Sequence, residues 1–494
     1  MAKIRSVKFN ALMNTLLTAS NMLVSLITIP YVTRILSVER LGDVSFAQSV
    51  STWVSALCLV GINVYGVREC AKVRDDEHEL ARVVRELLTI ITITTAVSLA
   101  GYAIAIVTVP SFASLAPLMW MFLVGTLMLS YGVEWFYQGI EQYSYITARS
   151  VVFKVAALVA TILLVRRPED YLVYGGILAL VTCGNNLLNL LRLNKLVDIR
   201  HVRDVNIRRH FRPLAAFGAQ SIAQAVYLSF DSTLLGILAS GNYQVGLYQL
   251  ATKLKAVMFQ VLNAVLGVFI PRLSHHLAVG DDKAFGQLLR TGFGITINVC
   301  VAIAFYLGVF AGPVVIFISG ESFAEAALPV RIIGIVNLIS CLSYFIGLCI
   351  LTPLGRERQL AMSNMVGVPL SMMLNFLLDP VYGAVGAASA LLVSEVVILS
   401  VQVWCSRDVL SRFVRPLDVM RVLASCGAGT VLAIVVAWVV DSVIPSSTFA
   451  IVAMGFMTFF IVDVSAAYLL GDPTARKICN YIRKKVIHGS HGNA

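Results

Sequence analysis

The sequence predicts an all-α membrane protein that crosses the bilayer about fourteen times, and three observations support this prediction. Of the 494 residues, 58% are apolar and only 13% are charged, whereas soluble domains carry roughly 25% charged residues. Long apolar runs recur along the chain, separated by short charged segments. The two halves of the chain also share a pattern of small and charged residues. We therefore expect two six-helix lobes related by a pseudo-two-fold axis, followed by two C-terminal helices.

The predicted spans are apolar runs of about 20 residues, the length that crosses the hydrocarbon as a helix. The basic start MAKIRSVKF leads directly into the first run, with no small-residue cleavage site after it, so we expect it to be retained as an anchor. The first six runs are 12–33, 43–66, 86–109, 115–138, 147–165 and 171–193. Eight more follow at 214–238, 245–270, 291–312, 328–351, 360–378, 383–404, 420–441 and 447–470.

The positive charges predict the orientation of these spans. Most of the 38 lysines and arginines fall in the N-terminus, the even-numbered loops and the C-terminus, which favours a cytoplasmic location for all of these segments. Because the net charge of +11 is accounted for in this way, nucleic acid is not an expected partner. The nine cysteines are scattered singly without a CxxC motif, so neither a disulfide nor a metal site is predicted.

An internal repeat predicts the lobes. Three residues of the first half match three of the second at a constant offset of 204 positions, and an Asp-Asp pair follows each set: Gly42, Ala47 and Arg68 match Gly246, Ala251 and Arg272. An offset of six spans preserves orientation and indicates a parallel repeat about an axis along the membrane normal. The predicted division is an N-lobe at 1–193, a cytoplasmic linker at 194–213, a C-lobe at 214–404, and two helices with a basic tail at 405–494.

Polar stripes on the seventh and eighth spans form the strongest candidate site. A charge at the middle of a bilayer costs at least about 2.5 to 3.5 kcal/mol and is therefore usually paired or functional. Asp231 is such a charge, and helical spacing places Gln224 on the same face. On the next span, Gln249, Lys253 and Gln260 form a matching stripe. Asp231 and Lys253 are equally far from the turn between the spans, so we predict that they pair.

Further polar residues extend this candidate site. The first span offers Asn14 and Asn21, and the second offers a stripe of Gln48, Thr52 and Ser55, with Asn63 one step off it. Lys154 in the fifth span either serves the same cavity or pairs with Glu134. For the neutral groups, hydrogen bonding across packed helices is the alternative interpretation. Lys255 is expected to contact another helix, whereas Glu395 and Asp463 show no partner in the sequence and are expected to have packing or head-group roles.

Four stretches resemble a known family. IPYVTRIL, GINVYGVRECAKVRDD, GVEWFYQGIEQYSYITARSVVFK, and QVGLYQLATKL with FIPRLS are similar to the Wzx-type polysaccharide repeat-unit flippases of the multidrug/oligosaccharidyl-lipid/polysaccharide exporter superfamily. The resemblance covers most of the chain. It implies alternating access in a bacterial cytoplasmic membrane, with a cationic lumen that accepts an undecaprenyl pyrophosphate-linked oligosaccharide. Since the first two spans lack a deep charge, the implied cations are Lys253, Lys154 and arginines at helix ends.

The resemblance also implies the class of protein, its coupling ion and its partners. It implies a transporter, not an enzyme, with no cofactor apart from a coupling ion, Na⁺ or H⁺. Membrane lipids, a polysaccharide polymerase and glycosyltransferases are the implied partners. Gating is expected at Arg68, Arg272, Arg34 and Glu134. The alternatives are a cation-coupled multidrug exporter or a lipid II flippase of the same superfamily, and more remotely a membrane glycan polymerase or ligase, which the short external loops disfavour.

Overall fold

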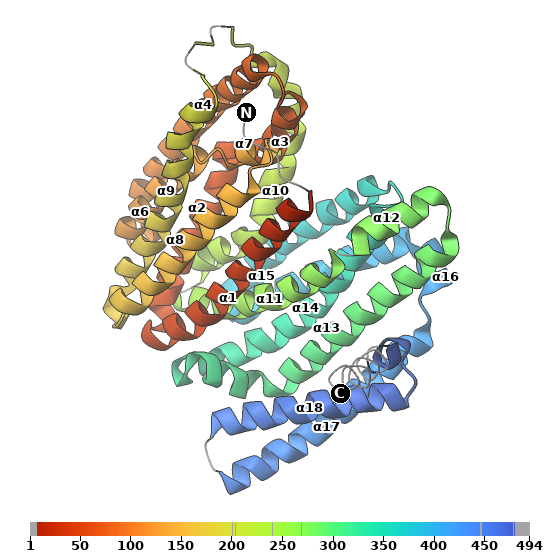
Figure 1. The fold of residues 1–494 in the computed structure, drawn as a ribbon. Coiled ribbons are helices and arrows are strands. Elements are labelled where there is room, and N and C mark those ends of the chain that lie inside the picture. The colour runs from red at the N-terminus through yellow and green to blue at the C-terminus, as the bar shows by residue number, and fades with distance from the viewer. Residues whose placement is uncertain are drawn as a thin grey trace, which may run out of the picture. The chain divides into compact units, whose positions relative to one another are not determined.

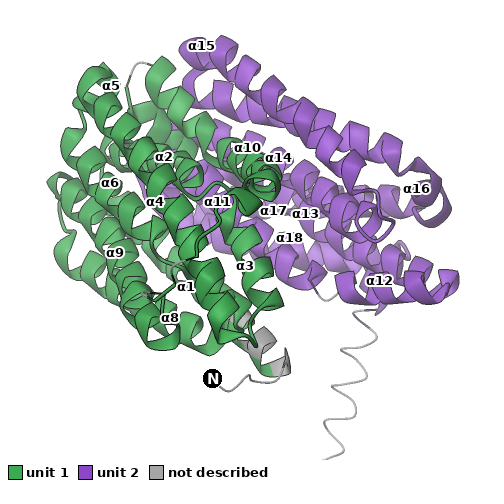
Figure 2. Cartoon of the chain, turned by 90° about the horizontal axis from the view of Figure 1, so that it is seen from above, with its two compact units in different colours: residues 1–249 green, residues 250–494 purple. Residues whose placement is uncertain are grey.

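The computed structural model describes residues 7–479 apart from 200, 203, 240, 268, 445, 446 and 478, and it describes no side chain for residues 7, 8, 10–12 and 14. Within the described ranges every regular element is a helix, as the sequence predicts (Figure 1). The chain forms two compact units, residues 1–249 and 250–494, which Figure 2 colours separately.

The first unit contains most of the helices with polar stripes. Its elements are α1 (Val7–Ile35), α2 (Val38–Leu59), α3 (Ile62–Lys72), α4 (Glu77–Thr108), α5 (Pro110–Ala113), α6 (Ala116–Ser130), α7 (Glu134–Gly139), α8 (Tyr143–Leu164), the 3₁₀ turn η1 (Pro168–Asp170), α9 (Tyr171–Leu196) and α10 (Arg208–Leu238). The unit boundary falls inside α11 (Tyr243–Leu266).

The second unit holds the rest of α11 and the C-terminal helices. Its elements are α12 (Phe269–Val279), α13 (Asp282–Ser319), the 3₁₀ turn η2 (Glu321–Ala326), α14 (Ala327–Phe345), the π-helical turn η3 (Ile346–Leu351), α15 (Glu357–Cys405), α16 (Arg407–Phe413), α17 (Pro416–Val443) and α18 (Thr448–Leu469). The last two helices pack side by side along their length, and α13 contacts both (Figure 1).

The number of spans agrees with the prediction of about fourteen. Thirteen helical segments in the described part of the chain are long and apolar enough to cross a membrane. One of them, the 49-residue α15, is two helices joined at Gly383, where φ is 53° and ψ is −129°. A left-handed φ of this kind favours glycine, which lacks a Cβ. Gly383 therefore separates the two spans predicted at 360–378 and 383–404.

Some predicted spans are not continuous helices. The run 43–66 breaks at Val60 and Gly61, which both have positive φ, and 115–138 breaks before α7, where Val133 has φ 42°. The run 245–270 breaks after Leu266. Hydropathy alone does not predict the breaks after α2 and α11, because the residues on both sides of each are apolar. At Gly61 the cause is close packing: a Cβ there would lie 2.4 Å from the backbone carbon of Phe217.

The repeated motifs correspond to repeated local structure. Each break after α2 and α11 is followed by an 11-residue helix, α3 or α12. The Asp-Asp pairs then begin the next spans. Asp76 accepts hydrogen bonds from the backbone N–H groups of His78 and Glu79 at the start of α4, and Asp281 accepts one from Ala284 at the start of α13. A carboxylate at this position satisfies N–H groups that the helix leaves unpaired.

Two glycines matched by the repeat let α2 and α11 begin in close contact. A Cβ on Gly42 would lie 1.8 Å from the carbonyl oxygen of Asn242, and a Cβ on Gly246 would lie 2.0 Å from that of Val38. The Asn242 side chain donates to Asp43 Oδ1 at 2.9 Å. These contacts explain why both halves of the chain carry glycine at the same point.

The helix α10 belongs to the first compact unit because it packs along α2. The hydroxyls of Ser49 and Thr233 lie 2.9 Å apart, and a Cβ on Gly236 would lie 2.2 Å from the Phe46 ring. The unit boundary thus falls after α10, whereas the predicted lobes divide at 194–213. The lobes describe a sequence repeat and remain a prediction.

A buried carboxylate ties the 194–213 segment to α4. Glu86 is fully buried and accepts hydrogen bonds from the backbone N–H of Asn206 at 2.7 Å and from Arg209 Nε at 2.8 Å. His210 Nε2 lies 2.8 Å from the same carboxylate, and its Nδ1 lies 2.8 Å from the Tyr65 hydroxyl. One carboxylate therefore joins α3, α4 and the start of α10.

Candidate functional site

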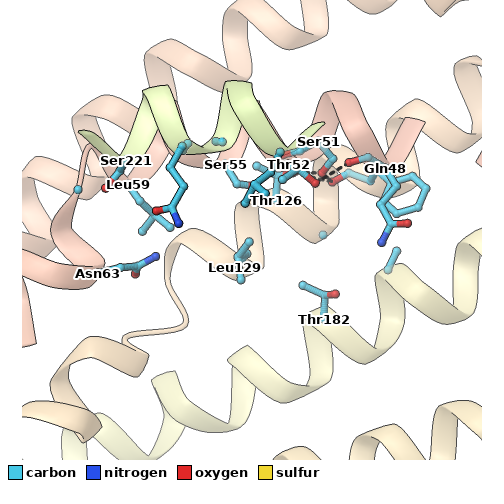
Figure 3. Close-up of a pocket in the computed structure, with 18 of the residues that line it drawn as sticks. Gln48, Ser51, Thr52, Ser55, Leu59, Asn63, Thr126, Leu129, Thr182 and Ser221 are labelled. Carbon is cyan, nitrogen blue, oxygen red and sulfur yellow. Dashed lines mark hydrogen bonds between the residues drawn. The ribbon is translucent and has the colours of Figure 1, made fainter. Parts of the chain in front are cut away.

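A polar cavity of the first unit follows the predicted stripe of α2. Its volume is about 440 Å³, and it is lined by residues of α2, α3, α6, α9 and α10. Figure 3 shows the polar side chains that face it, Gln48, Ser51, Thr52, Ser55, Asn63, Thr126, Thr182 and Ser221. Gln224 of α10 also lines it. The stripe predicted on the second span and Gln224 of the seventh thus line one cavity, whereas Asp231 is not among its lining residues.

Hydroxyl and amide groups give this cavity its chemistry. Ser51 and Thr126 are 2.5 Å apart through their hydroxyls, while Thr52 and Thr182 donate to backbone carbonyls one helical turn earlier. None of the described residues that line the cavity carries a charge. Such a wall can exchange hydrogen bonds with the hydroxyl groups of a neutral polar ligand. It offers an anion no counter-charge.

The predicted residues of the first and fifth spans also meet. Lys154 on α8 donates a hydrogen bond to Asn21 Oδ1 on α1. Glu134, the predicted alternative partner of this lysine, accepts a hydrogen bond from Gln138 at 3.4 Å, at the start of α7. The structure therefore supports a polar contact between the first and fifth spans. Asn14 lies outside the described side chains.

Asp231 and Lys253 are placed in different compact units, so their pairing remains a prediction. Asp231 is 8% exposed, and Tyr248 donates to its carboxylate at 3.4 Å. In the same unit, Gln249 donates to Ser232 Oγ at 3.3 Å. In the second unit, the side-chain oxygen of Gln260 is buried and has no hydrogen-bond partner among the described residues.

Glu395 has partners that the sequence did not reveal. Lys255 Nζ lies 3.6 Å from Glu395 Oε1, and Ser340 donates to the same oxygen at 2.7 Å. The prediction that Lys255 contacts another helix is confirmed, and Glu395 has a helix-packing role, as expected. Its partners were not visible in the sequence because they come from α11 and α14, which are distant along the chain. Asp463 does have a packing role, because Ser425 of α17 donates to it at 2.7 Å.

The predicted gating arginines lie near helix ends. Arg68 on α3 is half exposed, contacts Glu69 at 3.1 Å, and stacks over the rings of Tyr65 and Phe217. Arg272 lies on α12 and is exposed, and Arg34 lies in the last turn of α1. Arg68 and Arg272 thus occupy the same element in the two repeats.

Sequence reasoning missed a buried arginine. Arg149 on α8 is only 6% exposed and donates from Nε to Asn185 Oδ1 at 2.6 Å. Its two terminal nitrogens are buried and have no hydrogen-bond partner in the described part of the chain. On α9, Arg192 stacks on the Tyr145 ring at 3.9 Å, and Arg149 lies 5.3 Å from that ring. The available signal was one arginine five residues before Lys154 in an apolar run.

Comparison with known proteins identifies the family. Residues 7–276 match the model of a family described as polysaccharide biosynthesis protein, which is more than half of the chain. The chain belongs to this family. The resemblance inferred from the sequence motifs is therefore confirmed.

Two curated relatives share nearly their full length with this chain. A protein of Shigella dysenteriae named "Putative O-antigen transporter" is 25% identical over 399 residues, which are 79% of this chain and 98% of that protein. A protein of the same name from Escherichia coli strain K12 is 23% identical over 413 residues, covering 82% and 97%.

Two solved structures have the same fold. The lipid II flippase MurJ, in its inward closed conformation, matches with a TM-score of 0.66 over 95% of this chain and 99% of its own, at 10% identity. An inward-facing multidrug MATE transporter of the MOP superfamily matches with a TM-score of 0.59 at 14% identity, over 80% of this chain and 95% of its own. At these identities the likeness concerns the fold alone.

Proposed function

We propose that this protein is a flippase that moves undecaprenyl pyrophosphate-linked oligosaccharide repeat units from the cytoplasmic to the outer leaflet of a bacterial membrane. The observation that carries the proposal is the near full-length similarity to two proteins named as O-antigen transporters. We further propose that the two six-helix lobes alternate access to a lumen, as repeats do in transporters. The protein then acts as a transporter, not as an enzyme.

The site chemistry supports this substrate in two parts. The hydroxyl and amide wall of the first-unit cavity suits sugar hydroxyl groups, because each can both donate and accept hydrogen bonds. The pyrophosphate needs cations instead, and we assign these to Lys253 and Lys154, with Arg68 and Arg272 at the entry. The polyprenyl chain can stay in lipid, since it has no polar group to satisfy.

A reconstituted system tests the function and the cavity together. A fluorescent lipid-linked oligosaccharide, added to proteoliposomes, should become accessible to a lectin in the opposite leaflet when the wild-type protein is present. Thr182→Trp should fill the cavity and slow this movement at least tenfold. Thr108→Trp is the matched control, because Thr108 also donates to a carbonyl four residues earlier but is exposed at the end of α4. Wild-type movement of a cationic drug, without movement of the lipid, would contradict the proposal.

The cation-coupled exporter is the second candidate, and the shared fold with the MATE transporter is what favours it. A carboxylate-rich lumen without lysine would be expected for such an exporter. Lys154, Lys253 and Lys255 lie within the candidate spans of this chain. The flippase assignment is therefore the stronger one. We propose that the released carboxylate of Asp231 takes up a coupling ion, H⁺ or Na⁺, when the substrate binds.

Arg68 and Arg272 should act at entry. We expect Arg68→Ala and Arg272→Ala each to reduce glycan export several-fold, because each removes a cation that attracts the pyrophosphate from an equivalent point of the two repeats. Export is measured as glycan at the cell surface per folded transporter in the membrane. Arg212→Ala, which removes a cation at the start of α10, is the control. Normal export by both Arg68→Ala and Arg272→Ala would mean that they only anchor the helices.

The orientation also belongs to the proposal. We expect both termini and the 194–213 segment in the cytoplasm, where glycosyltransferases supply the substrate, and a polymerase to receive it on the other side. In a cysteine-free background, Val205→Cys should react with an impermeant maleimide only after the cells are opened. Ser114→Cys, in the exposed turn between α5 and α6, should react in intact cells. The reverse labelling pattern would overturn the arrangement.

A further inference from the structure

A second cavity lies in the second unit, where the ends of three membrane helices meet. Its volume is about 430 Å³, and its walls come from the first turns of α13, the link between α16 and α17, and the segment that follows α18. None of the residues predicted to bind substrate lines it. It is thus a separate feature from the cavity of the first unit.

Close packing builds this cavity. The Phe413 ring lies so near α13 that a Cβ on Gly286 would be 2.2 Å from it, and it meets the Phe285 ring edge to face at 6.1 Å. Farther along α13, a Cβ on Gly294 would lie 2.2 Å from the Thr474 hydroxyl. The segments that carry Phe413 and Thr474 therefore both contact α13 at glycines, which let them approach this helix closely.

The carboxylates in the cavity are already satisfied by protein groups. Asp418 accepts from Arg290 at 2.6 Å and from Arg421 at 3.3 Å. Asp472 accepts from the backbone N–H groups of Thr474 at 2.9 Å and Ala475 at 2.7 Å. Neither carboxylate needs a further cation.

Two cations of the cavity are left without a carboxylate. Lys477 donates to the Thr291 hydroxyl at 3.1 Å, and Arg415 is exposed. Neither forms an ion pair with another described residue. Three cations and two carboxylates line the cavity, Arg290, Arg415, Lys477, Asp418 and Asp472, so its net charge is positive. The two cations that are free of ion pairs suit a phosphate group, whose oxygens accept hydrogen bonds from both.

The position of the cavity fits the boundary between lipid head groups and hydrocarbon. The helix α13 has 38 residues, so at about 1.5 Å per residue it is longer than the roughly 30 Å hydrocarbon layer. Arg290 lies in its third turn, and Arg415 immediately precedes α17. Phe293, Ile297 and Val414 add an apolar wall. The charges at the helix ends can bind a phospholipid head group, and the apolar surface beside them can contact its acyl chains.

We propose that this cavity binds the phosphate head group of an anionic phospholipid of the adjoining leaflet. Arg415 and Lys477 contact the phosphate oxygens, the Thr291 hydroxyl holds the Lys477 ammonium group in place, and Phe293 and Ile297 contact the start of an acyl chain. Basic pockets between membrane helices are known to hold anionic head groups. The bound lipid is a resident of the transporter and is distinct from the lipid that it moves.

Native mass spectrometry of the full chain in a neutral detergent tests this site. Phosphatidylglycerol should bind, whereas phosphatidylcholine and inorganic phosphate at equal concentration should not. The double variant Arg415→Ala with Lys477→Ala should bind phosphatidylglycerol about thirtyfold more weakly, since each cation near a lipid head group contributes about one factor of five. The charge-retaining variant Arg415→Lys with Lys477→Arg should keep most of the affinity.

The matched control removes two cations outside the cavity. Lys283→Ala with Arg412→Ala changes the net charge equally, and both residues are exposed and do not line the cavity. This control should bind phosphatidylglycerol as the wild type does. Unchanged binding by the Arg415 and Lys477 double variant would overturn the proposal. If inorganic phosphate bound as well as phosphatidylglycerol, the site would bind a free anion and the proposal would be wrong. If the Arg415 and Lys477 double variant lost only the binding of lipid-linked pyrophosphate, the cavity would be a substrate site, which also overturns the proposal.

Discussion

Lys253→Ala is expected to abolish glycan export while the protein still inserts and accumulates in the membrane. In a low-dielectric wall an unpaired lysine tends to lose its proton, whereas a nearby carboxylate keeps it charged. We therefore predict that Asp231 holds Lys253 as a cation until the pyrophosphate arrives, when phosphate oxygens replace the carboxylate. Without the ammonium group the anionic head loses the cation that we assign to it on this helix. Export is measured as surface glycan in a strain that lacks the chromosomal gene.

Three variants separate this role from a structural one. Lys253→Arg should retain part of the export, because the charge survives while its reach and geometry change. Asp231→Asn should impair turnover more than substrate binding. Lys255→Ala is the control on the same helix: it removes the cation that contacts the buried Glu395 carboxylate, so it should lower the amount of folded protein but not the export per folded molecule. Normal export by Lys253→Ala would contradict this mechanism.

Glu86→Ala should be the most destabilising single substitution among those considered, at about 3 kcal/mol, because it leaves the buried His210 ring and the Asn206 N–H without their acceptor. The carboxylate is fully buried, and Arg209, His210 and a backbone N–H of the 194–213 segment converge on it. Its loss should free that segment from α4. Thermal unfolding of the purified protein in detergent, followed by size-exclusion chromatography, measures the effect as a lower midpoint.

Two companion variants check the cause. Glu86→Gln keeps the shape and one acceptor oxygen, so it should cost less than Glu86→Ala. Glu79→Ala removes the other, more exposed carboxylate that contacts Arg209 at 3.0 Å, and exposed pairs contribute about 1 kcal/mol at most. If Glu79→Ala lowered the unfolding midpoint as much as Glu86→Ala, the Glu86 cluster would not be what holds the segment.

The spans and one wall of the site were predictable because they depend on local pattern. Apolar runs of about 20 residues are sufficient to place membrane helices. Helical spacing was sufficient to put Gln48, Thr52 and Ser55 on one surface of α2. In the structure these three residues line a cavity together with Asn63 of α3 and Gln224 of α10.

The remaining features were not predictable because they depend on which helices meet. Glu86 is the first residue of a predicted span, where the sequence indicates a charge among the lipid head groups. In the structure its partners come from residues 206–210. Glu395 and Lys255 are 140 positions apart, and no spacing rule joins them. Likewise, the break at Gly61 follows from the approach of Phe217, which hydropathy does not encode.

The internal repeat shows both what the sequence could predict and what it could not. The sequence matched Gly42 with Gly246 and aligned the two Asp-Asp pairs, and the structure explains them as a helix contact and as helix N-caps. What the repeat did not predict is the packing of α10 along α2 within the first compact unit. Sequence similarity between the halves reports equivalent local structure, whereas the grouping of helices depends on side-chain contacts.

Deletion of the gene, followed by lipid extraction, tests the central proposal most directly. In the deletion strain, undecaprenyl pyrophosphate-linked repeat units should accumulate and remain inaccessible to an impermeant glycosidase added to intact spheroplasts. Restoring the wild-type gene, but not the Lys253→Ala variant, should make them accessible and return glycan to the surface. Lipid-linked repeat units that reach the outer leaflet at the normal rate in the deletion strain would contradict the assignment of this protein as their flippase.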